Sequence, residues 1–373
     1  MTRILRAYPD ELEIQSVREG IALAGQILKE GGLVAFPTET VYGLGANALD
    51  ADACRRIYAA KGRPSDNPLI VHIADIADLE RAAVRIPASA RMLAEKFWPG
   101  PLTMILHRNA DIPDATTGSL PTVAVRFPSH PTAMAMIRAG GGLIAAPSAN
   151  RSGRPSPTKA AHCIEDLDGR VDMIIDGGEV GIGLESSIID LTEDVPVLLR
   201  PGYVTVPMLR AVLGDVEVDQ AILGSDARPK APGMKYRHYA PRGQMVMVEG
   251  DEHAVAAYIN ERAGAFSAAG KKTAVLCAAQ SAGWYDREHL RVYCLGSRED
   301  PEQIAANLFG TLRQCDTDGM EEIFTESFSV GDLSGAIMNR LEKACGHRKI
   351  RIPEDGIIDD TGRSERNEDS IGE

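Results

Sequence analysis

Apolar residues along the first two hundred positions follow helical and strand-like patterns in turn. From Gln15 they recur at helical spacing as far as Gly31, and the apolar run at 33–36 that comes next is typical of a buried strand. Further strand-like runs lie at 69–73, 102–106, 123–127, 143–146, 173–175, 188–191 and 197–199. Helical patterns between them lie at 52–60, 88–97, 132–139 and 158–164. This alternation predicts an open, twisted α/β sheet covered by helices.

The pattern breaks after residue 202 and restarts near residue 244. The interval holds one helical pattern at 206–213, followed by a stretch rich in Gly, Pro, Lys and Arg that lacks periodicity and predicts a linker. Beyond it, strand-like runs at 245–248, 273–277, 292–295 and 322–324 alternate with helical patterns at 254–262, 301–313 and 336–344. We therefore predict a larger α/β domain at 13–203, a linker at 204–243, a smaller α/β domain at 244–350 and a tail at 351–373.

Charge and cysteine content narrow the class of protein. The net charge of -13 over 373 residues argues against a protein that binds polyanions by bulk attraction. Part of this charge comes from residues 353–373, which hold 8 acidic and 2 basic residues. This segment has too few apolar residues for their burial to offset the conformational entropy lost on folding. The six cysteines form no C-x-x-C pair, and no apolar run is long enough to cross a bilayer. We expect a cytoplasmic protein with free thiols and no membrane association.

Three polar segments follow predicted strands or helices, where α/β sheets place ligands. The first, PTETVYGLG at 37–45, is either a ligand loop or an ordinary turn. In the second, KGRPSDNPL, Lys61 and Arg63 accompany Ser65 and Asn67, a set that suits a polyphosphate but also fits a solvated basic turn. The third, APSANRSGRPSPT at 146–158, leads into a helix whose N-terminus favours anions, although a plain loop has the same composition.

Two residues at strand ends are further candidates. Arg126 could hold a carboxylate with its guanidinium, or it could form a surface ion pair. His72 stands between apolar residues, where a histidine is more often part of the core than a ligand contact. The sequence lacks G-x-x-x-x-G-K-[ST], H-E-x-x-H and G-x-S-x-G, so a protein that handles ATP here does so without a Walker loop.

Taken in order, seven segments give the chain a resemblance to a known family. They are PTETVYGLGANAL, KGRPSDNPL, FWPGPLT, VAVRFPSHP, APSANRSGRPSPT, ESSIIDLT and LRPG. The chain resembles the YrdC-like family, in the long, two-domain form of the L-threonylcarbamoyladenylate synthases, and PGMKYRHYAP continues the resemblance. It departs where ESSIID replaces the more usual ESTIVD. The resemblance implies an N-terminal YrdC-like open twisted α/β sheet domain, a linker and a smaller Rossmann-like α/β domain.

The resemblance also implies an activity. Members of the family convert L-threonine, bicarbonate or CO2, and ATP with Mg2+ into L-threonylcarbamoyl-AMP and pyrophosphate. A downstream threonylcarbamoyl transferase complex then uses this product to modify tRNA beside the anticodon, so tRNA is expected to be at most an indirect partner. The alternative is an RNA-binding module of the same fold without ATP turnover, which the acidic charge and the lack of an aromatic platform disfavour.

Site residues follow from the matching motifs. The resemblance implies catalytic roles for Lys61 and Arg63 and assigns no residue to a metal. It implies an ATP site made of Arg63, Asn67, Thr122, Ser148, Asn150, Thr158, Arg200 and Tyr239. It implies a threonine site made of Thr40, His72, Arg126, Ser148 and Ser186. A further hypothesis is that the linker closes over the bound nucleotide through Lys235, Arg237, His238 and Tyr239.

Overall fold

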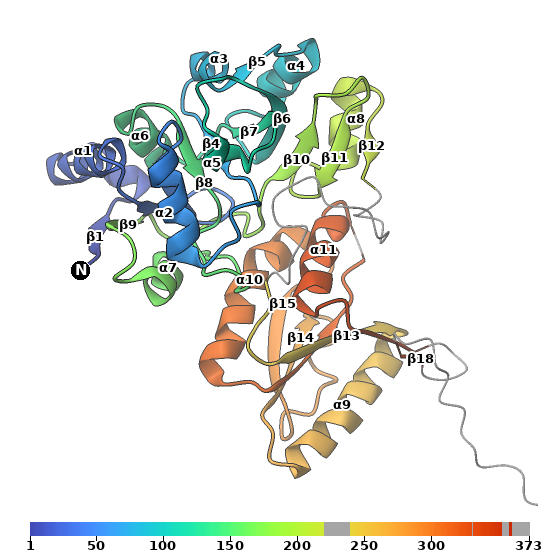
Figure 1. Cartoon of the computed structure of the whole chain (residues 1–373). Helices are drawn as coiled ribbons and strands as arrows, with labels where there is room; N and C mark the ends of the chain where they lie inside the picture. The colour runs from blue at the N-terminus through green and yellow to red at the C-terminus, as the bar shows by residue number, and fades with distance from the viewer. Residues whose placement is uncertain (220–238, 330, 353–357, 360–373) are drawn as a thin grey trace, which may run out of the picture. The chain divides into compact units, whose positions relative to one another are not determined.

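The computed structural model describes residues 1–219, 239–329, 331–352 and 358–359 (Figure 1). The chain divides into two compact units, Met1–Tyr236 and Arg237–Glu373. Three predicted linker residues, Lys235, Arg237 and His238, and most of the predicted tail lie outside the described residues. No described helix has the length and apolar character needed to cross a membrane.

A mixed β-sheet organises the first unit. Its described strands are β1 Arg3–Arg6, β2 Val34–Phe36, β3 Gly43–Asn47, β4 Ile70–His72, β5 Ala83–Val84, β6 Leu102–Arg108, β7 Thr122–Arg126, β8 Ile144–Ala146, β9 Met173–Asp176, β10 Ser187–Asp190, β11 Val197–Arg200 and β12 Glu217–Val218. They follow the order β1-β9-β2-β3-β8-β4-β7-β6-β10-β11-β12, and β5 pairs with β6. The predicted α/β sheet is therefore present, with parallel and antiparallel pairs mixed.

Helices lie on both faces of this sheet. They are α1 Gln15–Lys29, α2 Ala51–Lys61, α3 Leu79–Ala82, α4 Ala88–Phe97, α5 Asp114–Thr117, α6 Pro131–Ala139, α7 Ala160–Leu167 and α8 Val206–Leu213, with short 3-10 turns at Pro9–Glu11 and Ile76–Asp78. Helices α1 and α6 lie side by side and share a core with β2 and β8 (Figure 1). A larger core on the opposite face contains residues of α2, α4 and α8.

Part of the face shared with α1 and α6 belongs to neither core. On β4, β7, β6, β10 and β11 it carries a separate apolar cluster. That cluster consists of Ile70, Ile105, Ala124, Ile188 and Leu199. Polar side chains follow these apolar residues along the same face, because alternate residues of a strand share a face. The candidate active site is built on this part of the sheet.

Strand β3 was not predicted, because its sequence Gly-Leu-Gly-Ala-Asn looks like part of a loop. In the structure it pairs with β2 and β8. A Cβ on Gly43 would lie 3.0 Å from the Phe36 ring, and one on Gly45 would lie 2.9 Å from a methyl group of Ile144. Both glycines therefore allow close packing within the sheet rather than a turn. Helix α8 and strand β12, which fall within the predicted linker, contact α4 and pair with β11, respectively.

The second unit is a smaller α/β sheet. Its strands are β13 Gln244–Gly250, β14 Thr273–Ala278, β15 Arg291–Gly296, β16 Glu322–Glu326, β17 Lys349–Ile352 and β18 Ile358–Asp359. Its helices are α9 Glu252–Ala268, α10 Pro301–Asp318 and α11 Ser334–Ala344. The order is β15-β14-β16-β13-β17-β18, and all described pairs are parallel except β17 with β18. The last two strands were not predicted.

Candidate active site

Lys61 joins two of the segments singled out in the sequence. Asp50 caps the start of α2 by accepting hydrogen bonds from two backbone N–H groups, and Gly62 ends the helix with a φ of 64°, so Lys61 occupies the final position. Its side chain is buried, and its Nζ donates to the carbonyl oxygen of Ser148 at 2.5 Å and to that of Asn150. This ammonium group therefore fixes the 148–150 loop against the end of α2.

The 148–150 loop is held by its own side chains as well. The Ser148 hydroxyl donates to Asn150 Oδ1 at 2.5 Å. The Asn150 amide donates to the carbonyl oxygens of Arg151 at 2.8 Å and Arg154 at 2.9 Å. The Arg154 guanidinium pairs with Asp166 on α7. These contacts keep Ser148 and Asn150 in one arrangement without a ligand, which is the preorganisation a nucleotide site needs.

Arg63 and Asn67 lie on the turn between α2 and β4. Weak hydrogen bonds of 3.4 and 3.3 Å join the Arg63 guanidinium to the carbonyl oxygens of Asn67 and Pro68. Since Ile70 pairs with Ala124 in a parallel register, Thr122 at the start of β7 is level with Pro68. The structure thus brings three predicted ATP-site residues, Arg63, Asn67 and Thr122, to the same end of neighbouring strands.

Two residues of the predicted threonine site form a row across the sheet. His72 at the end of β4 pairs with Arg126 at the end of β7, and Arg126 pairs with Thr103 on β6. Directly paired residues point to the same face of a sheet, and all three side chains are buried. A guanidinium fixed in this row can bind a substrate carboxylate through two hydrogen bonds.

Ser186 extends the row and connects it to another predicted residue. Its hydroxyl lies 2.7 Å from that of Thr103. Arg200, which ends β11, donates to the carbonyl oxygen of Ser186 at 2.9 Å and to its hydroxyl at 3.1 Å. A residue predicted to bind ATP and one predicted to bind threonine are therefore in direct contact.

Sequence reasoning assigned no role to Glu39, although it is the only acid in the segment 37–45. Its Oε1 lies 2.8 Å from Nη2 of Arg126, whose side chain is 5% exposed, and the Glu39 side chain is 14% exposed. The backbone beside Glu39 is fixed, because the Thr38 hydroxyl accepts hydrogen bonds from the N–H groups of Thr40 and Val41 at 3.2 Å. The sequence feature that could have indicated a role for Glu39 is its position as a single acid among Thr, Tyr and Gly residues.

The same segment connects the two predicted subsites. Glu39 reaches Arg126, while the backbone of Tyr42 accepts a hydrogen bond from the N–H of Ala149 at 2.8 Å. Gly43 also forms an isolated β-bridge with Ser148. Residues 39–43 therefore contact both the arginine of the carboxylate site and the loop of the nucleotide site.

The remaining predicted residues are Thr40, Thr158 and Tyr239. The Thr40 hydroxyl is buried 2.9 Å from that of Thr38, and the N–H of Thr158 donates to Nδ1 of His162 at 3.2 Å. Tyr239 belongs to the second unit, where its ring centroid lies 5.0 Å from that of Phe309. The predicted roles of these three residues stay predictions.

His72 is neutral in the folded protein. Burial, and secondly the charge of Arg126, lower the pKa of His72 to about 3. Its Nδ1 lies 3.0 Å from the carbonyl oxygen of Ile70, and its ring meets the Phe36 ring edge-on at 5.9 Å. His72 therefore packs in the core and also belongs to the row of buried side chains that contains Arg126 and Thr103.

Acidification is expected to destabilise the first unit partly through His72. An unfolded histidine titrates near 6.5, so below that pH the unfolded chain binds a proton that the folded chain does not. This group's contribution to the free energy of unfolding should fall by up to about 1.4 kcal/mol per pH unit between pH 6.5 and 3. Denaturant unfolding at pH 7 and pH 5 measures the loss, which should be smaller in His72→Gln. An equal loss in both proteins contradicts the assignment.

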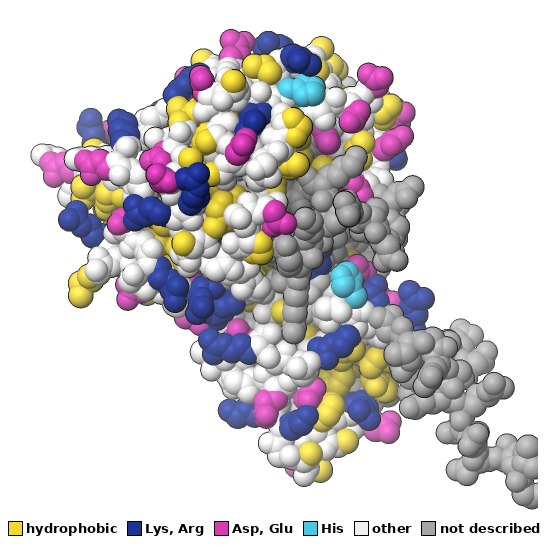
Figure 2. Space-filling view, in the orientation of Figure 1, with side chains coloured by type: hydrophobic (Ala, Val, Ile, Leu, Met, Phe, Trp, Pro, Cys, Tyr) yellow, Lys and Arg dark blue, Asp and Glu magenta, His cyan; other side chains and the backbone are white. Residues whose placement is uncertain are grey.

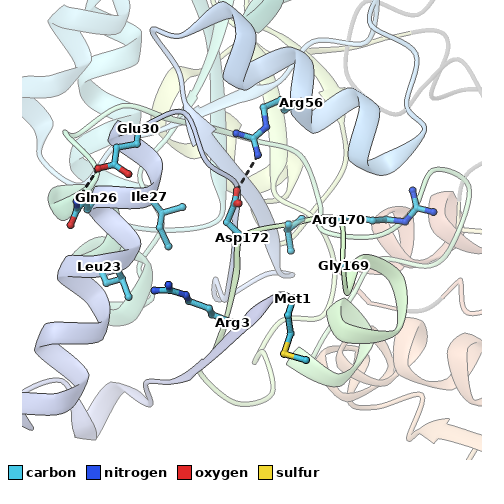
Figure 3. Close-up of a pocket in the computed structure, with 11 residues that line it drawn as sticks. Met1, Arg3, Leu23, Gln26, Ile27, Glu30, Arg56, Gly169, Arg170 and Asp172 are labelled. Carbon is cyan, nitrogen blue, oxygen red and sulfur yellow. Dashed lines mark hydrogen bonds and ion pairs between the residues drawn. The ribbon is translucent and has the colours of Figure 1, made fainter.

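A separate pocket of about 480 Å3 lies near the start of the chain (Figure 3). Residues of α1 and the turn before β9 line it, together with Arg3 and with Arg56, whose guanidinium lies 3.2 Å from Asp172. None of the predicted site residues lines this pocket. Its polar lining is already paired in part, so we do not place the active site there.

Comparisons with known proteins agree over most of the chain. A family model described as "Telomere recombination" matches residues 26–202, and one described as "Threonylcarbamoyl-AMP synthase, C-terminal domain" matches residues 204–346. The chain is 49% identical to the threonylcarbamoyl-AMP synthase of Pyrococcus abyssi, over 89% of this chain and 96% of that protein. It is 48% identical to the threonylcarbamoyl-AMP synthase of Bacillus subtilis, over 89% and 94%.

Solved structures show the same relationship. The crystal structure of Pyrococcus abyssi Sua5 complexed with L-threonine matches with a TM-score of 0.85 and 47% identity, covering 94% of this chain and 99% of that one. A variant of the same protein matches with a TM-score of 0.86 and 46% identity, covering 95% and 99%. The likeness therefore extends across both units.

Proposed function

The chain belongs to the threonylcarbamoyl-AMP synthases, and from this premise we propose that it joins L-threonine, bicarbonate or CO2, and ATP into L-threonylcarbamoyl-AMP and pyrophosphate. The family resemblance seen in the sequence motifs is thereby confirmed. The RNA-binding alternative has no such support, and Figure 2 shows basic and acidic side chains mixed over the visible face of the first unit. A polyanion surface would instead collect basic residues.

One observation carries the proposed chemistry: segment 39–43 connects the Arg126 site to the Ser148–Asn150 loop. Threonine held by its carboxylate at Arg126 would lie beside a nucleotide held by that loop and by Arg63. The uncharged amine of threonine combines with CO2 to give a carbamate and a proton, and the carbamate oxygen attacks the α-phosphorus as pyrophosphate leaves. Positioning and charge neutralisation can drive such a step without a protein nucleophile.

We assign the roles of the site residues accordingly. Arg63 neutralises the charge that develops on the leaving pyrophosphate, and Lys61 holds the 148–150 loop. Asn67, Thr122, Ser148, Asn150, Thr158, Arg200 and Tyr239 would contact ATP. Thr40, His72, Arg126, Ser148 and Ser186 would contact threonine. The contacts of Lys61, Arg126 and Ser186 described above support these assignments.

Mg2+ would enter with the nucleotide. The described residues contain no group of three His, Cys, Asp or Glu side chains arranged to hold a metal ion. Mg2+ commonly binds through substrate phosphates and water with few protein ligands, so this donor set fits an ion carried by ATP. When bound, the ion supplies positive charge to the phosphates. Lys61 and Arg63 act on the same region from the protein side.

The product would be a reactive mixed anhydride that another enzyme must consume. We propose that a threonylcarbamoyl transferase complex in the cytoplasm uses it to modify tRNA, and that this chain contacts tRNA at most indirectly. The proposal gives the second unit no chemical step, because the residues assigned to the reaction lie in the first unit apart from Tyr239.

Pyrophosphate release is expected to depend on threonine. The protein is mixed with ATP, Mg2+, bicarbonate and labelled L-threonine, and the products are separated to detect a labelled adenylate. Omitting threonine should stop pyrophosphate formation, because the attacking carbamate derives from its amine. L-2-Aminobutyrate, which is threonine without its hydroxyl group, serves as the matched control and should support much less product. Pyrophosphate release at the same rate without any amino acid would contradict the proposed reaction.

A further inference from the structure

Buried polar atoms of three side chains beside the proposed threonine site lack the hydrogen bonds that burial normally requires. Among the described residues, neither carboxylate oxygen of Glu39 has a hydrogen bond of acceptable geometry, although Oε1 lies 2.8 Å from Arg126. The same holds for Nε and Nη2 of Arg126 and for Nδ1 of His130. Buried polar groups in native proteins are nearly always hydrogen-bonded, so a cluster of exceptions calls for an explanation.

A purely structural ion pair does not account for this cluster. Charged pairs that stabilise a protein interior have good geometry and use their remaining hydrogen-bonding capacity on neighbours. Here the guanidinium and the carboxylate face each other with atoms of both unsatisfied. The pair is therefore better explained as two halves of a binding site, each with hydrogen-bonding capacity left for a ligand.

The charges of the cluster define the ligand. Burial lowers the pKa of His130, although Glu39 opposes this effect, and burial also lowers the pKa of His72. The two groups that define the pattern are the guanidinium of Arg126 and the carboxylate of Glu39. A ligand with only a carboxylate would satisfy Arg126 but would meet repulsion from Glu39. An α-amino acid carries a carboxylate and an ammonium group on one carbon, and it matches both.

We propose that Glu39 is the counter-ion of the α-ammonium group of the amino acid substrate. In the structure Glu39 Oε1 lies 2.8 Å from Arg126 Nη2. The incoming substrate replaces this pair by two, its carboxylate with Arg126 and its ammonium with Glu39. This inference rests on the proposed function and adds a positioning residue to it.

The backbone around both groups suits this exchange. Arg126 is fixed on β7 between its strand neighbours His72 and Thr103. Glu39 stands in a loop whose backbone is tied down, since its carbonyl oxygen accepts a hydrogen bond from the N–H of Ile182 at 2.9 Å. The Glu39 side chain can therefore turn from Arg126 to the ammonium without a rearrangement of the loop. Holding the amine in this way also directs it toward one place in the site.

The test compares ligands that differ by a single charged group. Isothermal titration calorimetry measures the binding of L-threonine and of (R)-3-hydroxybutyrate, which keeps the carboxylate and hydroxyl but lacks the ammonium. The unmodified protein should strongly prefer threonine. Glu39→Gln should lose about tenfold or more in threonine affinity and much of this preference, because the charge that recognises the ammonium is gone. Glu193→Gln, at an exposed position, is the matched control and should behave like the unmodified protein.

A second variant keeps the test decisive if Glu39→Gln does not fold. Glu39→Asp retains the charge but withdraws it by one methylene, and it should weaken threonine more than hydroxybutyrate. Thermal unfolding of each variant establishes that the fold is intact. Equal weakening of the two ligands, or an unchanged preference for threonine in a folded Glu39→Gln protein, overturns the inference. If the unmodified protein does not bind threonine, the proposed function fails as well.

Discussion

Replacing Arg63 by alanine is expected to reduce threonine-dependent pyrophosphate release roughly a hundred- to a thousand-fold. The guanidinium lies on the turn that leads from α2 into β4, near the loop held by Lys61. Charge that moves onto the leaving pyrophosphate needs a fixed cation nearby, and alanine removes it. The rate is measured with saturating threonine and bicarbonate while ATP is varied, so that kcat and KM are separated.

The fold should tolerate this change. Arg63 is only partly buried, and its hydrogen bonds to the carbonyl oxygens of Asn67 and Pro68, at 3.4 and 3.3 Å, are long. Its loss should therefore shift the thermal unfolding midpoint little. Arg55→Ala is the matched control, because Arg55 lies on α2, the helix that precedes Arg63, and has a largely exposed side chain that pairs with Asp52. A folded Arg63→Ala enzyme with the rate of the Arg55→Ala protein would refute the assignment of Arg63.

Local patterns were enough to predict most elements around the site. The helices at 88–97 and 206–213 were predicted with the bounds that the structure has, because their apolar spacing is regular and Pro or Gly residues mark at least one end. The strands that carry His72 and Arg126 were also predicted from short apolar runs. These signals lie within a few residues of each other along the chain, so no long-range contact is needed to recognise them.

Contacts between distant segments were not accessible in the same way. Residue type suggested that Arg126 binds a carboxylate, but nothing near it in the chain indicated that Glu39 already faces it. That pair depends on the order of strands in the sheet, which brings the segment after β2 to the end of β7. Strand β3 was missed for a related reason, since its glycines serve packing against Phe36 and Ile144 rather than a local turn.

Lys61 illustrates how the structure changes the meaning of a predicted residue. From the sequence its ammonium was expected to neutralise phosphate charge directly. In the structure it is 2% exposed and donates to the carbonyl oxygens of Ser148 and Asn150, so its first task is to hold the loop. Removing the charge of Lys61 should therefore abolish both its hold on the 148–150 loop and its contribution to neutralising phosphate charge.

Lys61→Met is expected to lower the free energy of unfolding by about 2–4 kcal/mol, because methionine fills much of the same space but leaves two buried carbonyl oxygens without their donor. For a unit of this size the thermal midpoint should fall by several degrees. Threonine-dependent pyrophosphate release, measured well below that midpoint, should fall at least a hundred-fold, since the nucleotide loop loses its anchor. Lys29→Met is the matched control, because Lys29 also ends a helix but is exposed, and it should change neither quantity. A Lys61→Met protein as stable as the control would show that the ammonium does not hold the loop, and normal activity in it would remove Lys61 from the site.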